Sequence, residues 1–170
     1  MREQMELDRE FCALLRTSLK LEKFFKDKLT TENVRMLFPA SGLYSYDKDD
    51  FILRQGEESK DLYVVRSGKV AITRIEGTAG AQLATLGPGE IFGEMALFGK
   101  EGRSATIRAM TEVRLFRIKR EYFEKLMDED HELALKLYRR ITRILTDRLQ
   151  QTTERLAVAN RIIRAASQKR

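Results

Sequence analysis

The 170-residue sequence is poor in the residues that cross-link chains or bind metal ions, since it has one cysteine, Cys12, and one histidine, His131. A single cysteine cannot form a disulfide within the chain, so a reducing, cytoplasmic setting is expected. With so few candidate ligands, no metal is expected and a cupin-type metalloenzyme is disfavoured. No nucleophile is paired with a general base, and His131 beside a predicted helix start is expected to have a surface or capping role. The sequence therefore predicts a protein that is not an enzyme.

Long apolar runs are also missing. No run approaches the roughly 20 apolar residues that a membrane-spanning helix needs, and the charged N-terminal segment MREQMELDRE lacks the pattern of a signal peptide. The composition, with 42% hydrophobic and 34% charged residues, is that of a soluble globular protein. The net charge of +6, from 32 basic and 26 acidic residues, favours anionic ligands or nucleic acid only weakly.

Periodicity at the start of the chain predicts helix. Over residues 1–27, one stripe recurs at spacings of three and four, which is typical of a helix face packed in a core or an interface; it consists of Leu7, Phe11, Leu14, Ser18, Leu21 and Phe25. A short helix is expected next, capped by Thr30 or Thr31 and ended by Pro39.

Between residues 43 and 118 the pattern changes to short strands separated by turn residues. The expected strands are 43–46, 51–53, 62–65, 70–75, 82–86, 104–108 and 113–118. The tripeptide Gly87-Pro88-Gly89 is a strong turn signal. Short strands at regular spacing predict a β-sandwich or a barrel.

After the strands, a short helix is expected over 119–126 and a long one from 131 to about 165. In its second half the long helix has a seam at alternating spacings of four and three, formed by Leu145, Leu149, Thr152, Leu156, Ala159 and Ile163. This heptad pattern predicts that the helix pairs with a copy of itself, which gives a homodimer. The alternative is a helix packed on its own domain, for example against the stripe of residues 1–27.

The stretch FGEMALFGKEGRSAT, residues 92–106, combines groups that suit a sugar phosphate. Small residues that open a helical turn expose backbone N–H groups to an anion. Arg103 offers a planar fork that holds phosphate at two points. Glu94 would repel an anion, so it is expected to face hydrogen-bond donors such as ribose hydroxyls. The stretch therefore predicts a pocket for a sugar phosphate with one negative charge.

These residues resemble the phosphate-binding cassette of the cyclic nucleotide-binding domain family, Phe-Gly-Glu-x-Ala-Leu, a short spacer, then Arg-(Ser/Ala/Thr)-Ala. Every position is filled, although Gly102 stands where many members have proline, which is expected to loosen the loop. The resemblance implies that Glu94 binds the ribose 2′-hydroxyl and Arg103 the cyclic phosphate. It assigns the rest of the cradle to Gly93, Met95, Ala96, Ser104 and Ala105. The alternative is a degenerate roll that binds no ligand.

A second pattern supports the same resemblance, because Gly56 and Gly68 frame the apolar run 62–65 as in the family. Ser59, at a place usually held by a smaller or similar residue, is expected to matter little. The resemblance implies a mainly β fold, a jelly-roll-like cyclic nucleotide-binding β-roll flanked by helices. Its expected domains are an N-terminal helical extension (1–29), the β-roll with its cassette (30–127) and a long C-terminal helix for dimerisation and ligand closure (128–170).

Residues 148–154 are similar to the central helix of the bacterial catabolite activator proteins, in which two adjacent hydroxyl residues contact adenine, one of them from the opposite subunit. The resemblance implies that Thr152 and Thr153 contact the base and that Arg148 lies close to the ligand. The alternative is that these threonines bond to carbonyls four residues earlier. Ser104 follows the arginine as in these activators, whereas many cyclic GMP sites have threonine, which favours cyclic AMP. A serine could still donate to a syn guanine.

The sequence thus predicts a cytoplasmic cyclic nucleotide sensor, with cyclic AMP as the preferred ligand, that acts on an effector protein or domain. A second interpretation is the ligand-binding part of a catabolite activator-type transcription regulator. The residues after Thr153 are too few for a helix-turn-helix domain, so DNA binding by this chain alone is not expected.

Overall fold

The structure is a computed structural model that describes residues 9–10, 12–14, 17, 42–77, 79–99, 101–129 and 131–167. It divides into two compact units, Met1–His131 and Glu132–Arg170. The described residues between 9 and 17 are helical. The rest of the predicted helix over 1–27, and the short helix predicted after Thr30, lie outside the described residues.

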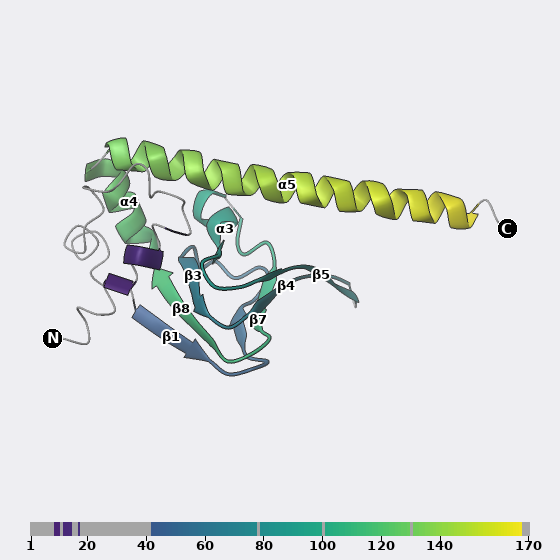
Figure 1. Ribbon diagram of the computed structural model, residues 1–170, viewed down its shortest axis with the longest axis horizontal. Coiled ribbons are helices and arrows are strands. Elements are labelled where there is room, and N and C mark those ends of the chain that lie inside the picture. The colour runs from purple at the N-terminus through teal and green to yellow at the C-terminus, as the bar shows by residue number, and fades with distance from the viewer. Residues whose placement is uncertain are drawn as a thin grey trace. The chain divides into compact units, whose positions relative to one another are not determined.

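The described part of the first unit contains two antiparallel sheets of four strands each (Figure 1). One sheet has the order β1 (Gly42–Tyr46), β8 (Val113–Ile118), β3 (Leu62–Ser67) and β6 (Ile91–Phe92). The other has the order β2 (Phe51–Leu53), β7 (Thr106–Ala109), β4 (Val70–Glu76) and β5 (Ala79–Leu86). The helices α3 (Glu94–Phe98) and α4 (Arg120–Glu129) follow β6 and β8. This arrangement confirms the predicted β-roll.

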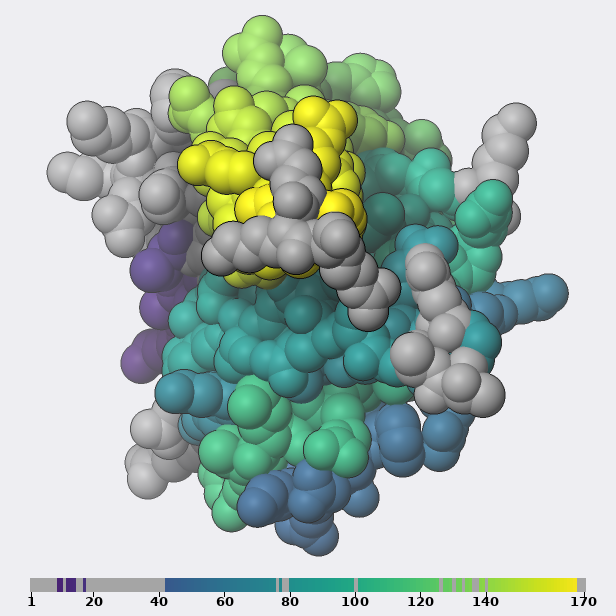
Figure 2. Space-filling view, turned by 90° about the vertical axis from the view of Figure 1, so that its right-hand side faces the viewer, coloured from purple at the N-terminus to yellow at the C-terminus, as the bar shows by residue number. Residues whose placement is uncertain are grey.

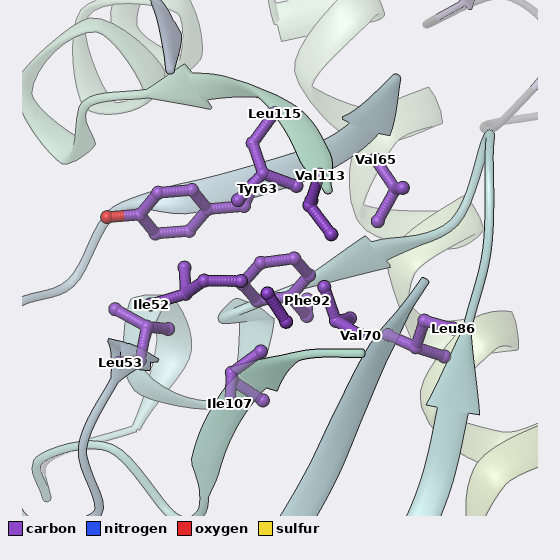
Figure 3. Close-up of a cluster of buried hydrophobic side chains, with 11 residues drawn as sticks. Ile52, Leu53, Tyr63, Val65, Val70, Leu86, Phe92, Ile107, Val113 and Leu115 are labelled. Carbon is purple, nitrogen blue, oxygen red and sulfur yellow. The ribbon is translucent and has the colours of Figure 1, made fainter. Parts of the chain in front are cut away.

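The core lies between the two sheets, and strands of both contribute to it (Figure 3). On β8 buried Val113 and Leu115 alternate with exposed Arg114, as expected for a strand with one face in the core. The rings of Tyr63 and Phe92 stack with their centroids 5.1 Å apart. Each such buried aromatic contributes roughly 1.5–3 kcal/mol to stability, so this stack anchors β6 against β3 directly before the cassette.

The turn between β3 and β4 shows why a glycine was needed there. Gly68 has a φ of +84°, and a Cβ atom would lie 2.2 Å from the backbone oxygen of Glu112. Both the left-handed conformation and the close approach of two backbones exclude a side chain. The glycine that ends the apolar-run pattern therefore lets the chain turn from β3 in one sheet into β4 in the other.

Several strands differ from the sequence-based prediction, among them β3, which runs to Ser67 and not to residue 65. β5 begins at Ala79, not at residue 82, because it pairs with the far end of β4, where Ala79 faces Glu76. The added residues Ala79–Ala81 have little intrinsic strand preference, so pairing decides their conformation. β6 was not predicted because its two residues are too few to show an alternating pattern. β7 begins at Thr106, not at residue 104.

The described residues of the second unit all belong to one helix, α5 (His131–Ser167), whose first residue lies in the first unit; this confirms the long C-terminal helix. Its C-terminal turns, yellow in Figure 2, expose Ile162 and Ile163. In the part of the chain that the structure describes, no helix is both long and apolar enough to cross a membrane.

Candidate nucleotide-binding site

The cassette begins where β6 passes into α3. Gly93 caps this helix with a φ of +89°, and a Cβ atom there would lie 2.6 Å from the carbonyl oxygen of Asp61 and 2.7 Å from Nη1 of Arg103. The first intrahelical bond runs from the Leu97 N–H to the Gly93 carbonyl. The N–H groups that precede it therefore open a helical turn next to Arg103, as an anion cradle requires.

Arg103 is 4% exposed and is held by three acceptors. Its Nε donates to Ser59 Oγ at 2.9 Å, its Nη1 to the Gly93 carbonyl at 3.1 Å and its Nη2 to the Asp61 carbonyl at 2.9 Å. Its guanidinium carbon also lies 5.8 Å from the centre of the Tyr63 ring. These contacts fix the direction of the guanidinium from two segments of the chain, residues 59–63 and Gly93.

The backbone of Arg103 is also held by hydrogen bonds. The Arg103 N–H donates to the Glu57 carbonyl and the Arg103 carbonyl accepts from the Gly56 N–H, both at 2.8 Å. Gly102, expected to loosen the loop, lies against this segment, and a Cβ atom there would be 2.7 Å from the Glu57 oxygen. Glycine at residue 102 therefore allows the backbone there to pack closely against the backbone of Gly56 and Glu57.

All three acceptors of the Arg103 side chain are neutral. They use three of the five N–H donors of a guanidinium, so two donors are left, among the described residues, for an anion that the positive charge would attract. Burial lowers the pKa of Arg103, while Tyr63, Asp61 and Glu57 act in the opposite direction. An arginine remains protonated in proteins despite such a shift, so the site presents a buried cation.

The other predicted cassette residues fall into two groups. Glu94 is 2% exposed in the first turn of α3, and Ala96 and Ala105 are buried with it. Met95 is exposed, and its sulfur lies 3.3 Å from the hydroxyl of Ser104. The structure thus brings Gly93 to Arg103 and Met95 to Ser104. The assignment of Glu94 to ribose remains a prediction.

The predicted base contacts Arg148, Thr152 and Thr153 lie on α5, in the second unit. Thr152 Oγ1 donates to the Arg148 carbonyl and Thr153 Oγ1 to the Leu149 carbonyl, both at 2.9 Å. These are the local bonds that were the alternative to a role in binding. Each hydroxyl keeps its acceptor lone pairs, so both threonines could still accept a hydrogen bond from a base.

Sequence reasoning did not assign four residues around Arg103 to the site, namely Ser59, Asp61, Tyr63 and Arg117. Ser59 was expected to matter little, yet its hydroxyl is a direct partner of Arg103. Asp61 supplies a carbonyl and holds Arg117, and Tyr63 lies beneath the guanidinium. Burial raises the pKa of Tyr63 to about 12, so its phenol is neutral beside two arginines at physiological pH. The one sequence feature that could have indicated these residues is the charged Asp61 directly before the apolar run 62–65.

Comparisons with known proteins agree with this geometry. The model of the cyclic nucleotide-binding domain family matches residues 43–130, which include both sheets and the cassette. The chain belongs to this family. A cyclic nucleotide-binding domain from Methylobacillus flagellatus has the same fold, with a TM-score of 0.74, 24% identity and coverage of 86% of this chain and 83% of that one.

Relatives of this cyclic nucleotide-binding domain include proteins named for different nucleotides. The cGMP-dependent protein kinase 2 of Mus musculus is 36% identical over 129 residues, 74% of this chain and 16% of the kinase. The cyclic AMP receptor protein of Thermus thermophilus is 39% identical over 101 residues, 56% of this chain and 47% of the receptor. The Thermus thermophilus catabolite activator protein structure has a TM-score of 0.64 at 30% identity, covering 79% of this chain and 62% of that one. The chain thus spans less than half the length of the Mus musculus kinase and of the Thermus thermophilus cyclic AMP receptor protein.

Among the described residues, no group of three or more His, Cys, Asp or Glu side chains could hold a metal ion. The histidine Nδ1 of His131 lies 3.1 Å from the Met127 carbonyl, at the junction of α4 and α5.

Proposed function

We propose that this cyclic nucleotide-binding domain is a sensor of cyclic AMP, in which the cassette binds phosphate and ribose. The observation that carries the proposal is the buried Arg103, which is directed by three neutral acceptors and is left with its charge and two donors. A cyclic phosphate has one negative charge and two exocyclic oxygens, which suits two remaining N–H groups. The N–H groups at the start of α3 complete the cradle, and Glu94 takes the ribose hydroxyl.

The preference for adenine rests on Ser104 and on the hydroxyls of Thr152 and Thr153. Both threonine hydroxyls already donate to helix carbonyls, so they are disposed to accept. Adenine presents an amino donor at its N6, whereas guanine presents an acceptor at O6. The cyclic AMP-bound form of the EAL enzyme Bd1971 is a structural relative at 30% identity, with a TM-score of 0.50 and coverage of 75% of this chain. These facts favour cyclic AMP, with Arg148 near the ligand.

A thermal-shift panel of cyclic AMP, cyclic GMP and linear AMP tests both parts of the proposal. Cyclic AMP at 100 times its Kd is expected to raise the unfolding free energy by about 2.7 kcal/mol, because only the folded state binds it. Cyclic GMP is expected to give a smaller shift, and linear AMP, with a second negative charge on an open phosphate, little or none. No shift with any nucleotide would indicate an empty roll. A larger shift with cyclic GMP would contradict the assignment of the base.

We further propose that α5 pairs with the same helix of a second copy. The predicted seam is exposed at Leu149, Leu156 and Ile163, at 67%, 60% and 61%. Exposed aliphatic residues at heptad spacing are typical of helices that pair along a seam. A homodimer of this kind places the base-binding threonines at the pairing surface, so occupancy and pairing would be linked.

Replacement of Leu156 by aspartate is expected to convert the dimer to a monomer, because it places a charge in the middle of the seam. Light scattering coupled to gel filtration measures the mass directly. Val158→Asp is the matched control, since Val158 is also exposed on α5 but falls outside the seam. A wild-type protein of monomer mass at high micromolar concentration, or equal effects of the two variants, contradicts pairing through this seam.

We infer a regulatory role rather than a catalytic one, with an effector protein or domain as the recipient of the signal. Because this chain spans 47% of the Thermus thermophilus cyclic AMP receptor protein, the ligand-binding part of a transcription regulator is the second candidate. A ligand-dependent change at α5 is the output expected in either case, and it requires that the nucleotide bind two arrangements of the helix unequally.

A further inference from the structure

Asp61 stands between Arg103 and the start of α4. Its backbone carbonyl accepts the hydrogen bond from Arg103 Nη2 at 2.9 Å. Its carboxylate has other partners: Oδ2 accepts from Arg117 Nε at 2.6 Å, and Oδ1 accepts from the Arg120 backbone N–H at 3.1 Å. One buried residue thus offers a neutral acceptor to Arg103 and a charged acceptor to Arg117.

Arg117 is well placed to hold this carboxylate. It lies on β8 opposite Tyr63 of β3, and its guanidinium carbon is 5.6 Å from the centre of the Tyr44 ring. Two of its nitrogens, Nε and Nη2, face the same Oδ2 of Asp61 at 2.6 and 2.5 Å. Burial lowers the pKa of Arg117, but the hydrogen bond and charge of Asp61 contribute to a net increase. Arg117 therefore faces the Asp61 side chain as a cation.

Without Arg117, the Asp61 carboxylate would compete with the ligand for the N–H donors of Arg103. The carboxylate and carbonyl of Asp61 are separated only by Cα and Cβ, and the charge of the carboxylate already acts on Arg103. Once Arg117 is gone, a rotation of the side chain away from the Arg120 N–H would bring the carboxylate toward Arg103. A hydrogen bond between two charged groups is about twice as strong as one between neutral groups. The carboxylate would carry the charge of a cyclic phosphate and would occupy the donors that the phosphate needs.

We propose that Arg117 is a positioning residue that holds the Asp61 carboxylate and so keeps Arg103 available to a cyclic phosphate. The inference rests on the proposed function and adds to it a group within the chain that competes with the ligand. Arg117 acts through Asp61 and does not itself contact the nucleotide. Its loss is therefore harmful only while residue 61 carries a carboxylate.

The test compares Arg117→Gln, Asp61→Asn and the double variant by calorimetric titration with cyclic AMP. Arg117→Gln is expected to weaken binding by about tenfold, the effect of one hydrogen bond to a charged group. The double variant is expected to recover most of this loss, because an amide does not compete for Arg103 as a carboxylate does. Arg114→Gln, an exposed neighbour on β8 paired with Glu112 at 3.6 Å, is the matched control and is expected to bind like wild type.

A purely structural role for the ion pair predicts a different pattern. Both single variants break the same pair, so their affinities would fall equally and the double variant would recover nothing. That pattern overturns the proposal.

Nitrogen-15 NMR of the arginine side chains tests the same idea without ligand. The Nε–H signal of Arg103 is expected to shift in Arg117→Gln and to return toward its wild-type position in the double variant. An Arg103 signal that does not move in Arg117→Gln overturns the proposal, whether or not the wild-type protein binds cyclic AMP. A wild-type protein that shows no binding refutes the proposed function alone.

Discussion

Replacement of Arg103 by alanine is expected to weaken cyclic AMP binding by roughly two orders of magnitude or more. Two hydrogen bonds to a charged phosphate are worth about 1.5–3 kcal/mol each, and every 1.4 kcal/mol is about a factor of ten. Arg103 is buried and its remaining donors are not engaged by described residues, so the alanine variant loses both donors and the charge that the phosphate would use. Isothermal titration calorimetry measures the loss.

The design must separate binding from folding, since Arg103 also satisfies the Ser59 hydroxyl and two carbonyls. The melting temperature of each ligand-free variant provides that check. Arg103→Lys retains the charge but not the planar fork, and is expected to lie between wild type and alanine. Arg108→Ala removes an exposed arginine of β7, paired with Asp49 at 3.3 Å, and serves as the control for net charge. Unchanged affinity in a folded Arg103→Ala protein would refute the assignment of the phosphate site.

Replacement of Gly93 by alanine is expected to lower both stability and binding. The left-handed conformation costs an L residue about 1–2 kcal/mol, and overpacking adds typically 1–3 kcal/mol. The new Cβ atom would meet the Asp61 oxygen at 2.6 Å and Arg103 Nη1 at 2.7 Å, so the guanidinium must move. At roughly 2–4 °C per kcal/mol for a protein of this size, the melting temperature is expected to fall by about 4–20 °C. The rise in melting temperature on addition of cyclic AMP is expected to be lost as well, because the guanidinium is displaced.

Gly56 provides the matched control for this experiment. Its φ of +87° is close to that of Gly93, but a Cβ atom there would meet no atom within 4 Å. Gly56→Ala is therefore expected to show only the conformational cost. Thermal unfolding of the two variants, with and without cyclic AMP, compares them directly. Equal losses in both would mean that the close approach of Gly93 to Arg103 has no energetic importance.

Much of this site was predictable because it depends on local sequence. Gly93 and Arg103 belong to one short stretch, and their roles follow from a left-handed cap and a planar cation. Ser59 and Asp61 come from a loop more than forty residues earlier and meet Arg103 only when β3 and β6 pair. Their contribution depends on strand register, which a sequence pattern does not specify. The ion pair between Asp61 and Arg117 depends on the pairing of a third strand, β8, so it could not be predicted from the sequence either.

The two-residue strand β6 and the early start of β5 were missed for a related reason. Both are set by a partner strand: Ile91 and Phe92 face Val64 and Tyr63, and Ala79–Ala81 face the end of β4. Where residues carry their own signal, as in Val113–Ile118, the predicted and observed strands coincide. The base-binding role of Thr152 and Thr153 stays a prediction.

The pairing of β1 with β8 has a consequence for the synthesis of this protein. Gly42, in the first strand of the roll, faces Arg117, in the last, and β8 also separates β1 from β3 within their sheet. The sheet cannot close until the ribosome has released the segment around Ile118, and contacts this distant in sequence form slowly. Until then β1 and β3 each have an open edge, which is a template for association with other chains. Nascent chains that stall before β8 are thus the form of this protein most in need of a chaperone.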